Sequence, residues 1–276
     1  MNSSLSRLSG LYSHLPNRSF SPYWQAGAPQ VLRWLELHPE DVVLEVGCGH
    51  GLWTSFIAPR VRATYACDID VPAIRGAALW QSPREPYQPR ACVGFVQASG
   101  TDLPFADTAF SKVLGVDVLE HIPDHCAMMG EIARVLKPDG RIVMTTLLRN
   151  RPAYIRKITF LDHVREYGTE DFQELFREVG LQIAQTFYFY YMPTTVAREL
   201  NMLVGQSRIG KVVGVDLVMG PAWRLVCDIE RLYRRGRPGG IGVVATKGEQ
   251  TQHLKPDAAS EGTRMSAPQP VRNATG

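Results

Sequence analysis

The sequence lacks any run of about 18 apolar residues, the length that a helix needs to cross a bilayer. Its best candidate, VVGVDLVMG, is interrupted by Asp216. The five cysteines form no C-x-x-C pair, and the Ser-rich start lacks the apolar segment of a secretion signal. These absences predict a cytoplasmic protein with free thiols.

A strong excess of charge of either sign is also missing. The 30 Lys and Arg residues nearly balance the 27 Asp and Glu residues, and the basic residues are scattered. We therefore expect no nucleic-acid partner. One basic cluster, RLYRRGRPGG (Arg231 to Gly240), has two interpretations. A solvated helix end is the commoner one, and a site for anionic lipid or phosphate is the alternative.

Several catalytic motifs are absent. No G-x-S-x-G occurs, so nothing indicates a hydrolase with a nucleophilic serine. His121 and His125 are four residues apart, but Pro123 lies between them and the Glu of an H-E-x-x-H motif is missing. We therefore expect no metal site.

The length suits one large domain with an insertion. We expect an N-terminal arm and cap helix over residues 1–39, a main domain over 40–247 and a disordered tail over 248–276. A helical insertion on the substrate side is expected at about residues 193–237. Strands alternate with helices along the main domain, which predicts an α/β fold with a mostly parallel, doubly wound sheet. Strands are expected at 41–47, 62–70, 92–99, within 112–122, and at 141–148, 181–191 and 240–247.

A glycine loop follows the first of these strands, in VLEVGCGHGLWT (Val43 to Thr54). Glycine lets backbone approach a ligand closely because it has no Cβ. A dinucleotide motif, G-x-G-x-x-G, would place its third glycine at Leu52, and a P-loop would need G-K-[ST]. Neither pattern is present. A tight turn without any ligand is the alternative.

Acidic and polar residues close the following strands. Asp68 ends the second strand, where a carboxylate either binds a ribose diol or caps the next helix. Ser99 ends the third strand, and Asp117 ends the fourth. Because the carboxyl ends of parallel strands meet at one edge of the sheet, we expect these residues and the glycine loop to border one crevice.

The ordered set E-x-G-x-G-x-G, CDID, TDLPFADTAFSKV, VLEHIPD and RVLKPDGRIVMTT resembles class I S-adenosylmethionine-dependent methyltransferases. The resemblance covers about residues 40–185. It is closest to the small-molecule group that includes ubiquinone/menaquinone-type and sugar or polyketide enzymes. It implies a Rossmann-like, seven-stranded sheet with an antiparallel last strand. It also implies S-adenosylmethionine as cofactor and S-adenosylhomocysteine as product.

The resemblance also implies roles for individual residues. Glu45 would orient the ammonium of the cofactor, and Asp68 would bind its ribose. Ser99 stands where the family often has an acid for the adenine amino group, so its hydrogen bond would be weaker. The other implied cofactor residues are Gly47, Cys48, Gly49 and Gly51 around methionine and ribose, Ile69 and Gly100 at adenine, and Val116 and Asp117 near the methionine part.

The acceptor is less defined. A hydroxyl acceptor needs a base, and His121 and His163 are the two candidates, although the L-E-H-I segment recurs in the family without always being catalytic. We expect O- or C-methylation of a small-molecule or lipid-like acceptor. The apolar insertion would cover it or rest on a membrane surface, and no obligate protein partner is evident. The alternatives are a nicotinamide-dependent oxidoreductase and a non-catalytic binding protein with the same fold.

Overall fold

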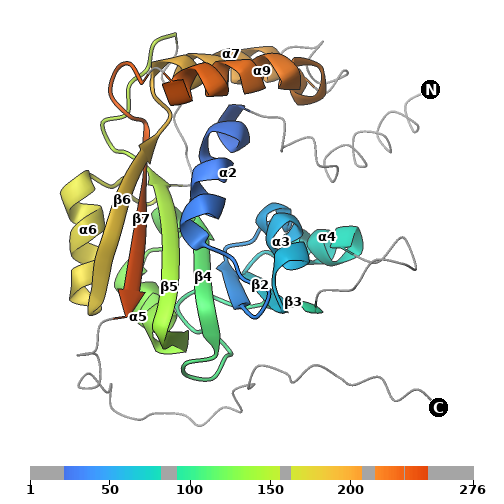
Figure 1. The fold of residues 1–276 in the computed structure, drawn as a ribbon, viewed down its shortest axis with the longest axis vertical. Coiled ribbons are helices and arrows are strands. Elements are labelled where there is room, and N and C mark those ends of the chain that lie inside the picture. Colours follow the sequence, from blue (N-terminus) through green and yellow to red (C-terminus); the bar gives the residue numbers. More distant parts are fainter. Residues whose placement is uncertain (1–21, 82–91, 156–162, 207–214, 233, 248–276) are drawn as a thin grey trace.

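The computed structural model describes residues 22–81, 92–155, 163–206, 215–232 and 234–247 (Figure 1). Residues 1–21 of the expected N-terminal arm and cap helix, and the expected tail over 248–276, lie outside these ranges. Seven strands form one sheet in the order β3-β2-β1-β4-β5-β7-β6. Their bounds are β1 Val42–Val46, β2 Ala63–Asp68, β3 Cys92–Gln97, β4 Phe110–Val116, β5 Leu136–Leu147, β6 Leu181–Phe189 and β7 Gly240–Lys247.

The direction of the strands agrees with the sequence prediction. β1 pairs in parallel with β2 and β4, as do β2 with β3 and β4 with β5. β7 is antiparallel to both of its neighbours, β5 and β6. The predicted doubly wound sheet with an antiparallel last strand is therefore confirmed.

Helices cover both faces of this sheet. Residues alternate along the central strands, so that Val113 and Ile142 belong to one apolar core and Leu114 and Val143 to the other. The first core packs against α5 and α6, and the second against α2 and α3. The helix bounds are α2 Pro22–Leu35, α3 Leu52–Ile57, α4 Val71–Gln81, α5 His125–Val135, α6 Thr169–Glu178, α7 Met192–Gln206 and α9 Val215–Leu232, with 3-10 turns η2 Ala58–Arg60 and η3 Leu119–His121.

Two helix starts show how local sequence defines these elements. The Asp124 side chain accepts a hydrogen bond from the Ala127 N–H at 2.9 Å and so caps α5. At α6, Gly168 precedes the helix and Thr169 is its first residue. The carboxylate of Asp171 accepts the Gly168 N–H at 3.0 Å.

The helical insertion lies beyond the carboxyl ends of β5 and β6, where α7 and α9 pack side by side (Figure 1). Aromatic residues at the end of β6 connect this layer to α2. Phe187 is buried and stacks on Trp34 of α2 with ring centroids 6.3 Å apart, and Phe189 and Tyr190 are buried next to it. In the described part of the chain, no helix is both long and apolar enough to cross a membrane.

Candidate active site

The glycine loop connects β1 to α3 in a conformation that favours glycine. Gly47, Gly49 and Gly51 all have positive φ, at 73°, 50° and 73°. The N–H groups of Gly47 and Cys48 donate to the carbonyl oxygen of Cys67 at 2.8 and 3.0 Å. The loop is therefore anchored to the end of β2 at the edge where parallel-sheet enzymes bind ligands.

The three glycines differ in what surrounds them. A Cβ on Gly47 would lie 2.4 Å from Cγ2 of Val118, and one on Gly51 would lie 3.0 Å from Ala77 Cβ. A Cβ on Gly49 would meet no atom of the described residues within 4 Å. Packing thus requires Gly47 and Gly51, whereas Gly49 borders open space that a ligand can fill.

Asp68 connects this loop to the segment after β2. Its Oδ2 accepts the Gly49 N–H at 2.7 Å, and its Oδ1 accepts the Asp70 N–H at 2.9 Å. The helix-cap alternative applies to Asp70, whose Oδ1 accepts the Ala73 N–H at the start of α4. A carboxylate offers about four lone-pair sites. Asp68 therefore has capacity left for hydroxyl donors.

Glu45 lies in the middle of the buried strand β1 and is only 2% exposed. Its carboxylate accepts a hydrogen bond from the Thr54 hydroxyl of α3. Burial raises the pKa of Glu45 to about 8, because the charged form loses its solvation. A cation placed nearby would favour the ionised form again, as the ammonium of an amino-acid ligand would do.

The remaining predicted cofactor residues have mixed surroundings. Ile69 is 71% exposed directly after β2, and the buried Cys48 thiol contacts the Gly49 carbonyl at 3.6 Å. The Ser99 hydroxyl is 2.8 Å from the Thr101 hydroxyl and accepts the Thr101 N–H. A Cβ on Gly100 would lie 3.2 Å from Met128, so this glycine has a packing reason of its own.

The end of β4 is strained. Asp117 follows Val116 with φ at 50°, in the left-handed region that few non-glycine residues adopt. Its N–H donates to the Thr145 carbonyl at 3.0 Å, and its carboxylate accepts a hydrogen bond from the Thr145 hydroxyl at 3.4 Å. Loss of solvation raises the pKa of Asp117 to about 7, although Arg198 of α7 acts in the opposite direction. The Asp117 side chain thus faces the insertion.

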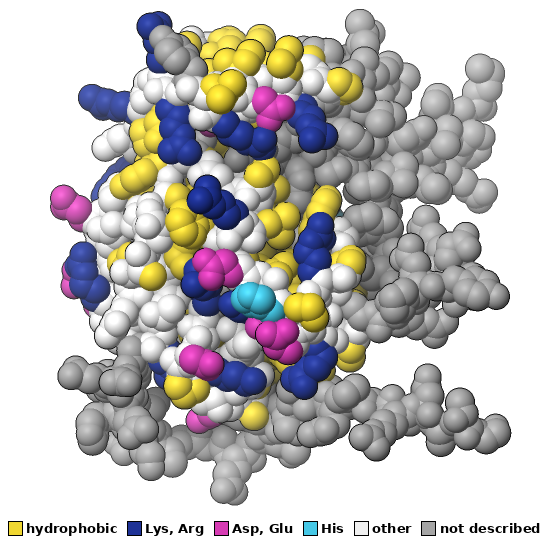
Figure 2. Space-filling view, in the orientation of Figure 1, with side chains coloured by type: hydrophobic (Ala, Val, Ile, Leu, Met, Phe, Trp, Pro, Cys, Tyr) yellow, Lys and Arg dark blue, Asp and Glu magenta, His cyan; other side chains and the backbone are white. Residues whose placement is uncertain are grey.

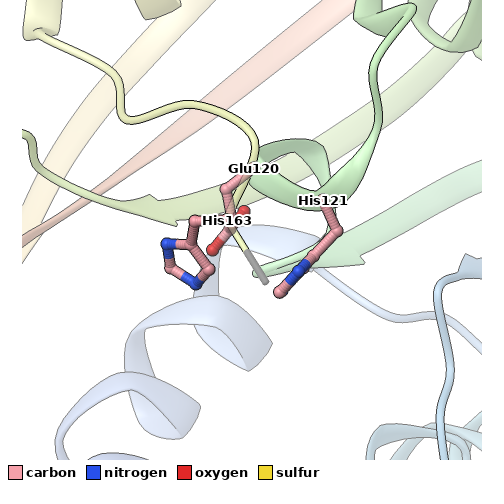
Figure 3. A group of neighbouring side chains, drawn as sticks. All are labelled: Glu120, His121 and His163. Carbon is pink, nitrogen blue, oxygen red and sulfur yellow. The ribbon is translucent and has the colours of Figure 1, made fainter. Parts of the chain in front are cut away.

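His121 and His163, predicted separately, lie together (Figure 3). Their ring centroids are 4.8 Å apart and the rings are nearly perpendicular. The Val164 N–H donates to the Glu120 carbonyl at 2.9 Å, which holds the segment after β5 against η3. The sequence did not predict this contact, because it joins two segments that are distant along the chain.

Glu120 was not predicted as a site residue, although it stands next to His121 in VLEHI. It is buried, and one ligand atom from each of Glu120, His121 and His163 lies within 4.8 Å of the others (Figure 3). His125 points elsewhere, with Nδ1 2.7 Å from the Tyr167 hydroxyl. The expectation of no metal considered only His121 and His125, and for this trio it stays a prediction.

This arrangement matches that of a known family. Residues 44–144, from β1 into β5, match the family model described as a methyltransferase domain. Together with the sheet order, the glycine loop and the acid after β2, this match supports a class I S-adenosylmethionine-dependent methyltransferase that uses S-adenosylmethionine as its cofactor.

Curated relatives carry the same activity in their names. The ubiquinone biosynthesis O-methyltransferase of Thiobacillus denitrificans is 26% identical over 202 residues, which cover 67% of this chain and 84% of that protein. Methyltransferase GfsG of Streptomyces halstedii is 28% identical over 148 residues, half of each chain.

Solved structures share the fold. The [4+2]-cyclase SpnF aligns with a TM-score of 0.59 at 21% identity and covers 82% of each chain. Geranyl diphosphate C-methyltransferase from Streptomyces coelicolor, solved with Mg²⁺, geranyl diphosphate and S-adenosylhomocysteine, aligns with a TM-score of 0.57 at 15% identity. That alignment covers 80% of this chain and 77% of that one. Identities this low show the fold alone.

Proposed function

We propose that this methyltransferase transfers the sulfonium methyl group to a hydroxyl oxygen of a small-molecule, lipid-like acceptor. The observation that carries the proposal is the contact between His121 and His163 beyond the end of β4. Two half-buried imidazoles at this edge supply a base at the place where an acceptor would meet the cofactor. The name of the relative from Thiobacillus denitrificans, an O-methyltransferase of ubiquinone biosynthesis, agrees with this acceptor chemistry.

The cofactor would occupy the crevice beside Gly49. In this proposal Asp68 accepts hydrogen bonds from the ribose hydroxyls, and Ile69 packs against the adenine ring. Glu45 holds the ammonium, and the loop backbone from Gly47 to Gly51 follows the methionine and ribose. Ser99 and Gly100 border the adenine, and Val116 and Asp117 border the methionine part. The open space at Gly49 and the lone pairs left on Asp68 support this placement.

The reaction would be an in-line displacement. The acceptor oxygen forms a bond to the methyl carbon while the carbon–sulfur bond breaks, and S-adenosylhomocysteine leaves. One imidazole of the pair takes the hydroxyl proton. Alignment of oxygen, carbon and sulfur supplies much of the rate enhancement, and the base contributes about 10²- to 10⁴-fold more.

The test uses His121→Asn and His163→Asn with labelled S-adenosylmethionine and two probe classes, catechols and hydroquinones with a short isoprenoid tail. We expect the loss of either base to slow transfer by about 10²-fold or more without weakening S-adenosylhomocysteine binding. His125→Asn is the matched control, because His125 contacts Tyr167 rather than the pair, and its rate should stay within about threefold of wild type.

Three results would contradict the proposal: unchanged rates in both variants, a product methylated on carbon, or no transfer to any hydroxylated probe by a protein that binds S-adenosylhomocysteine. Parallel assays with EDTA and with added Mg²⁺ or Zn²⁺ distinguish a base from a metal ligand. A base role predicts that activity survives the chelator.

We also propose that the outer face of α9 contacts an anionic membrane. Leu225 and Leu232 are 63% and 90% exposed, and Ile229 lies between them at helical spacing. Figure 2 shows apolar side chains gathered at the end of the molecule that α7 and α9 form, with Lys and Arg side chains beside them. The exposed basic residues in this part are Arg224, Arg231, Arg234, Arg235 and Arg237. Apolar insertion combined with basic charge is the pattern of interfacial helices.

Vesicle flotation tests this contact. We expect binding to vesicles that contain phosphatidylglycerol, weaker binding to pure phosphatidylcholine, and loss of both on Leu225→Asp with Leu232→Asp. Equal flotation of wild type and variant would contradict the proposal, as would an absence of binding to the anionic vesicles.

A further inference from the structure

Arg198 on α7 is a buried cation in the layer that covers the acceptor side of the sheet. The residue is only 7% exposed. Its guanidinium lies over the ring of Tyr190, 5.3 Å from the centroid, and is within electrostatic range of Asp117. It therefore faces the end of β4, close to where the cofactor is proposed to end.

The guanidinium has few partners of its own. Nε and Nη1 are fully buried, and neither atom has a hydrogen-bond partner in the described part of the chain. Arginine presents five N–H donors in a planar fork. A buried donor without a hydrogen bond costs free energy of folding. Buried polar groups of this kind generally have a partner, which a bound ligand can supply.

Neighbouring carboxylates are engaged with other donors. Glu199 accepts hydrogen bonds from the N–H groups of Tyr154 and Ile155, the closest at 2.6 Å. Glu166 accepts from Arg151 at 2.5 Å. Glu230 of α9 accepts the Thr194 N–H at 3.0 Å. These acids stabilise the layer, and Nε and Nη1 of Arg198 remain without a hydrogen-bond partner in the described residues.

The backbone around Arg198 is also unusual. Asp117 and Tyr190 are two of the four non-glycine residues with positive φ in the described ranges, and both face this guanidinium. Each follows a strand directly, Asp117 after β4 and Tyr190 after β6. Residues strained in this way concentrate at binding sites, where surrounding structure holds them in position.

We infer that Arg198 binds an acidic group of the methyl acceptor, a carboxylate or a phosphate. The inference deepens the proposed function and rests on it. The planar fork of arginine suits two parallel hydrogen bonds to either group. The guanidinium would hold the acid inside the α7 layer while the reacting hydroxyl reaches His121 and His163. Asp117 would lie beside the bound acid, and Arg151 would add a second positive charge nearby.

The carboxylate of the cofactor's methionine part has the same chemistry, so the experiment separates the two sources. Acidic probes, 3,4-dihydroxybenzoate and geranyl diphosphate, are compared with the neutral 3,4-dihydroxybenzamide and geraniol. Each is titrated into the protein saturated with S-adenosylhomocysteine. We expect wild type to bind the acidic member of at least one pair about tenfold or more tightly than its neutral counterpart. Arg198→Met should abolish this preference and leave S-adenosylhomocysteine affinity within about twofold.

Arg198→Lys keeps the positive charge but loses the planar guanidinium, so it should retain only part of the preference for acidic probes. This variant replaces Arg198→Met in the test if Arg198→Met does not fold. Arg177→Met is the matched control, since Arg177 is an exposed arginine of α6 paired with Glu174 and should leave the preference unchanged. The inference is overturned if wild type shows no preference for the acidic probes. It is also overturned if Arg198→Met loses much of its S-adenosylhomocysteine affinity, because Arg198 would then bind the cofactor. Failure of wild type to bind S-adenosylhomocysteine at all would instead refute the proposed function.

Discussion

The proposed cofactor side and the proposed acceptor side of the site are built differently. On the proposed cofactor side, the glycine loop, Asp68 and Glu45 lie within one β-α-β unit, and neighbouring backbone supplies most of their hydrogen bonds. On the proposed acceptor side, His121, His163 and Arg198 come from three separate segments, and the side chain of Arg198 is buried without a full set of partners. The proposed cofactor side would bind the cofactor, which every member of the class shares. The proposed acceptor side is formed by tertiary contacts, which can change without disturbing the cofactor side.

The largest effect should come from Gly49→Val. A side chain there fills the open space beside the loop and also forces a β-branched residue into positive φ. We expect S-adenosylhomocysteine affinity, measured by calorimetry, to fall by about 100-fold or more while the far-UV circular dichroism stays unchanged. Gly51→Val is the contrast, because its side chain would collide with Ala77 and Phe95 and should destabilise the fold itself. Wild-type affinity in Gly49→Val would show that the cofactor lies elsewhere.

Asp68→Ala should have the next largest effect on the cofactor side. It removes the acceptor of the Gly49 and Asp70 N–H groups and, in the proposed placement, of the ribose hydroxyls. The expected loss of S-adenosylhomocysteine binding is about 2 kcal/mol. Asp68→Asn keeps one oxygen and should lose less. A stability loss with no change in affinity would reduce Asp68 to a structural residue.

Glu199→Ala examines the acceptor side. It leaves the N–H groups of Tyr154 and Ile155 without their buried acceptor, so the free energy of unfolding in urea should fall by about 1–3 kcal/mol. Affinity for S-adenosylhomocysteine should not change, because Glu199 belongs to the proposed acceptor side of the site. A joint loss would show that the two sides are coupled. Glu174→Ala, an exposed acid on α6, is the control.

The last expected effect is a pH dependence from Glu45. Its pKa is about 8 in the folded protein, above the ordinary 4.5, so its contribution to stability falls as pH rises from about 4.5 to about 8. An ammonium beside Glu45 favours the ionised form, so cofactor binding should release this proton. Affinity for S-adenosylhomocysteine should then rise from pH 6 to pH 8 by at most about tenfold per pH unit, and Glu45→Gln should bind with a flatter profile. An identical profile in both proteins would separate Glu45 from the ammonium.

The proposed cofactor side could be predicted from the sequence because its signals are local. The spacing of Gly47, Gly49 and Gly51 after a buried strand, with Asp68 at the end of the next, lies in one short segment. The sequence did not show which of these glycines is required by packing and which leaves room for a ligand. Gly47 avoids Val118 and Gly51 avoids Ala77, two contacts that depend on how η3 and α4 pack. Of the three loop glycines, only Gly49 faces open space among the described residues.

Only some residues of the proposed acceptor side could be predicted from the sequence. The two histidines were recognisable as possible bases, but their contact depends on the backbone bonds between Glu120 and the segment at Val164. Arg198 gave no signal at all, since an arginine in an amphipathic helix is ordinarily solvated. Its burial follows from how α7 lies on Tyr190 and on the strand ends.

The sequence by itself determined the fold class and the methyl donor, because alternating apolar strands and a glycine loop are encoded by neighbouring residues. Only the tertiary structure decided which imidazoles meet, which of the three loop glycines borders open space and which cation is buried facing Asp117. These depend on contacts between segments far apart in the chain, and local sequence patterns do not specify such contacts.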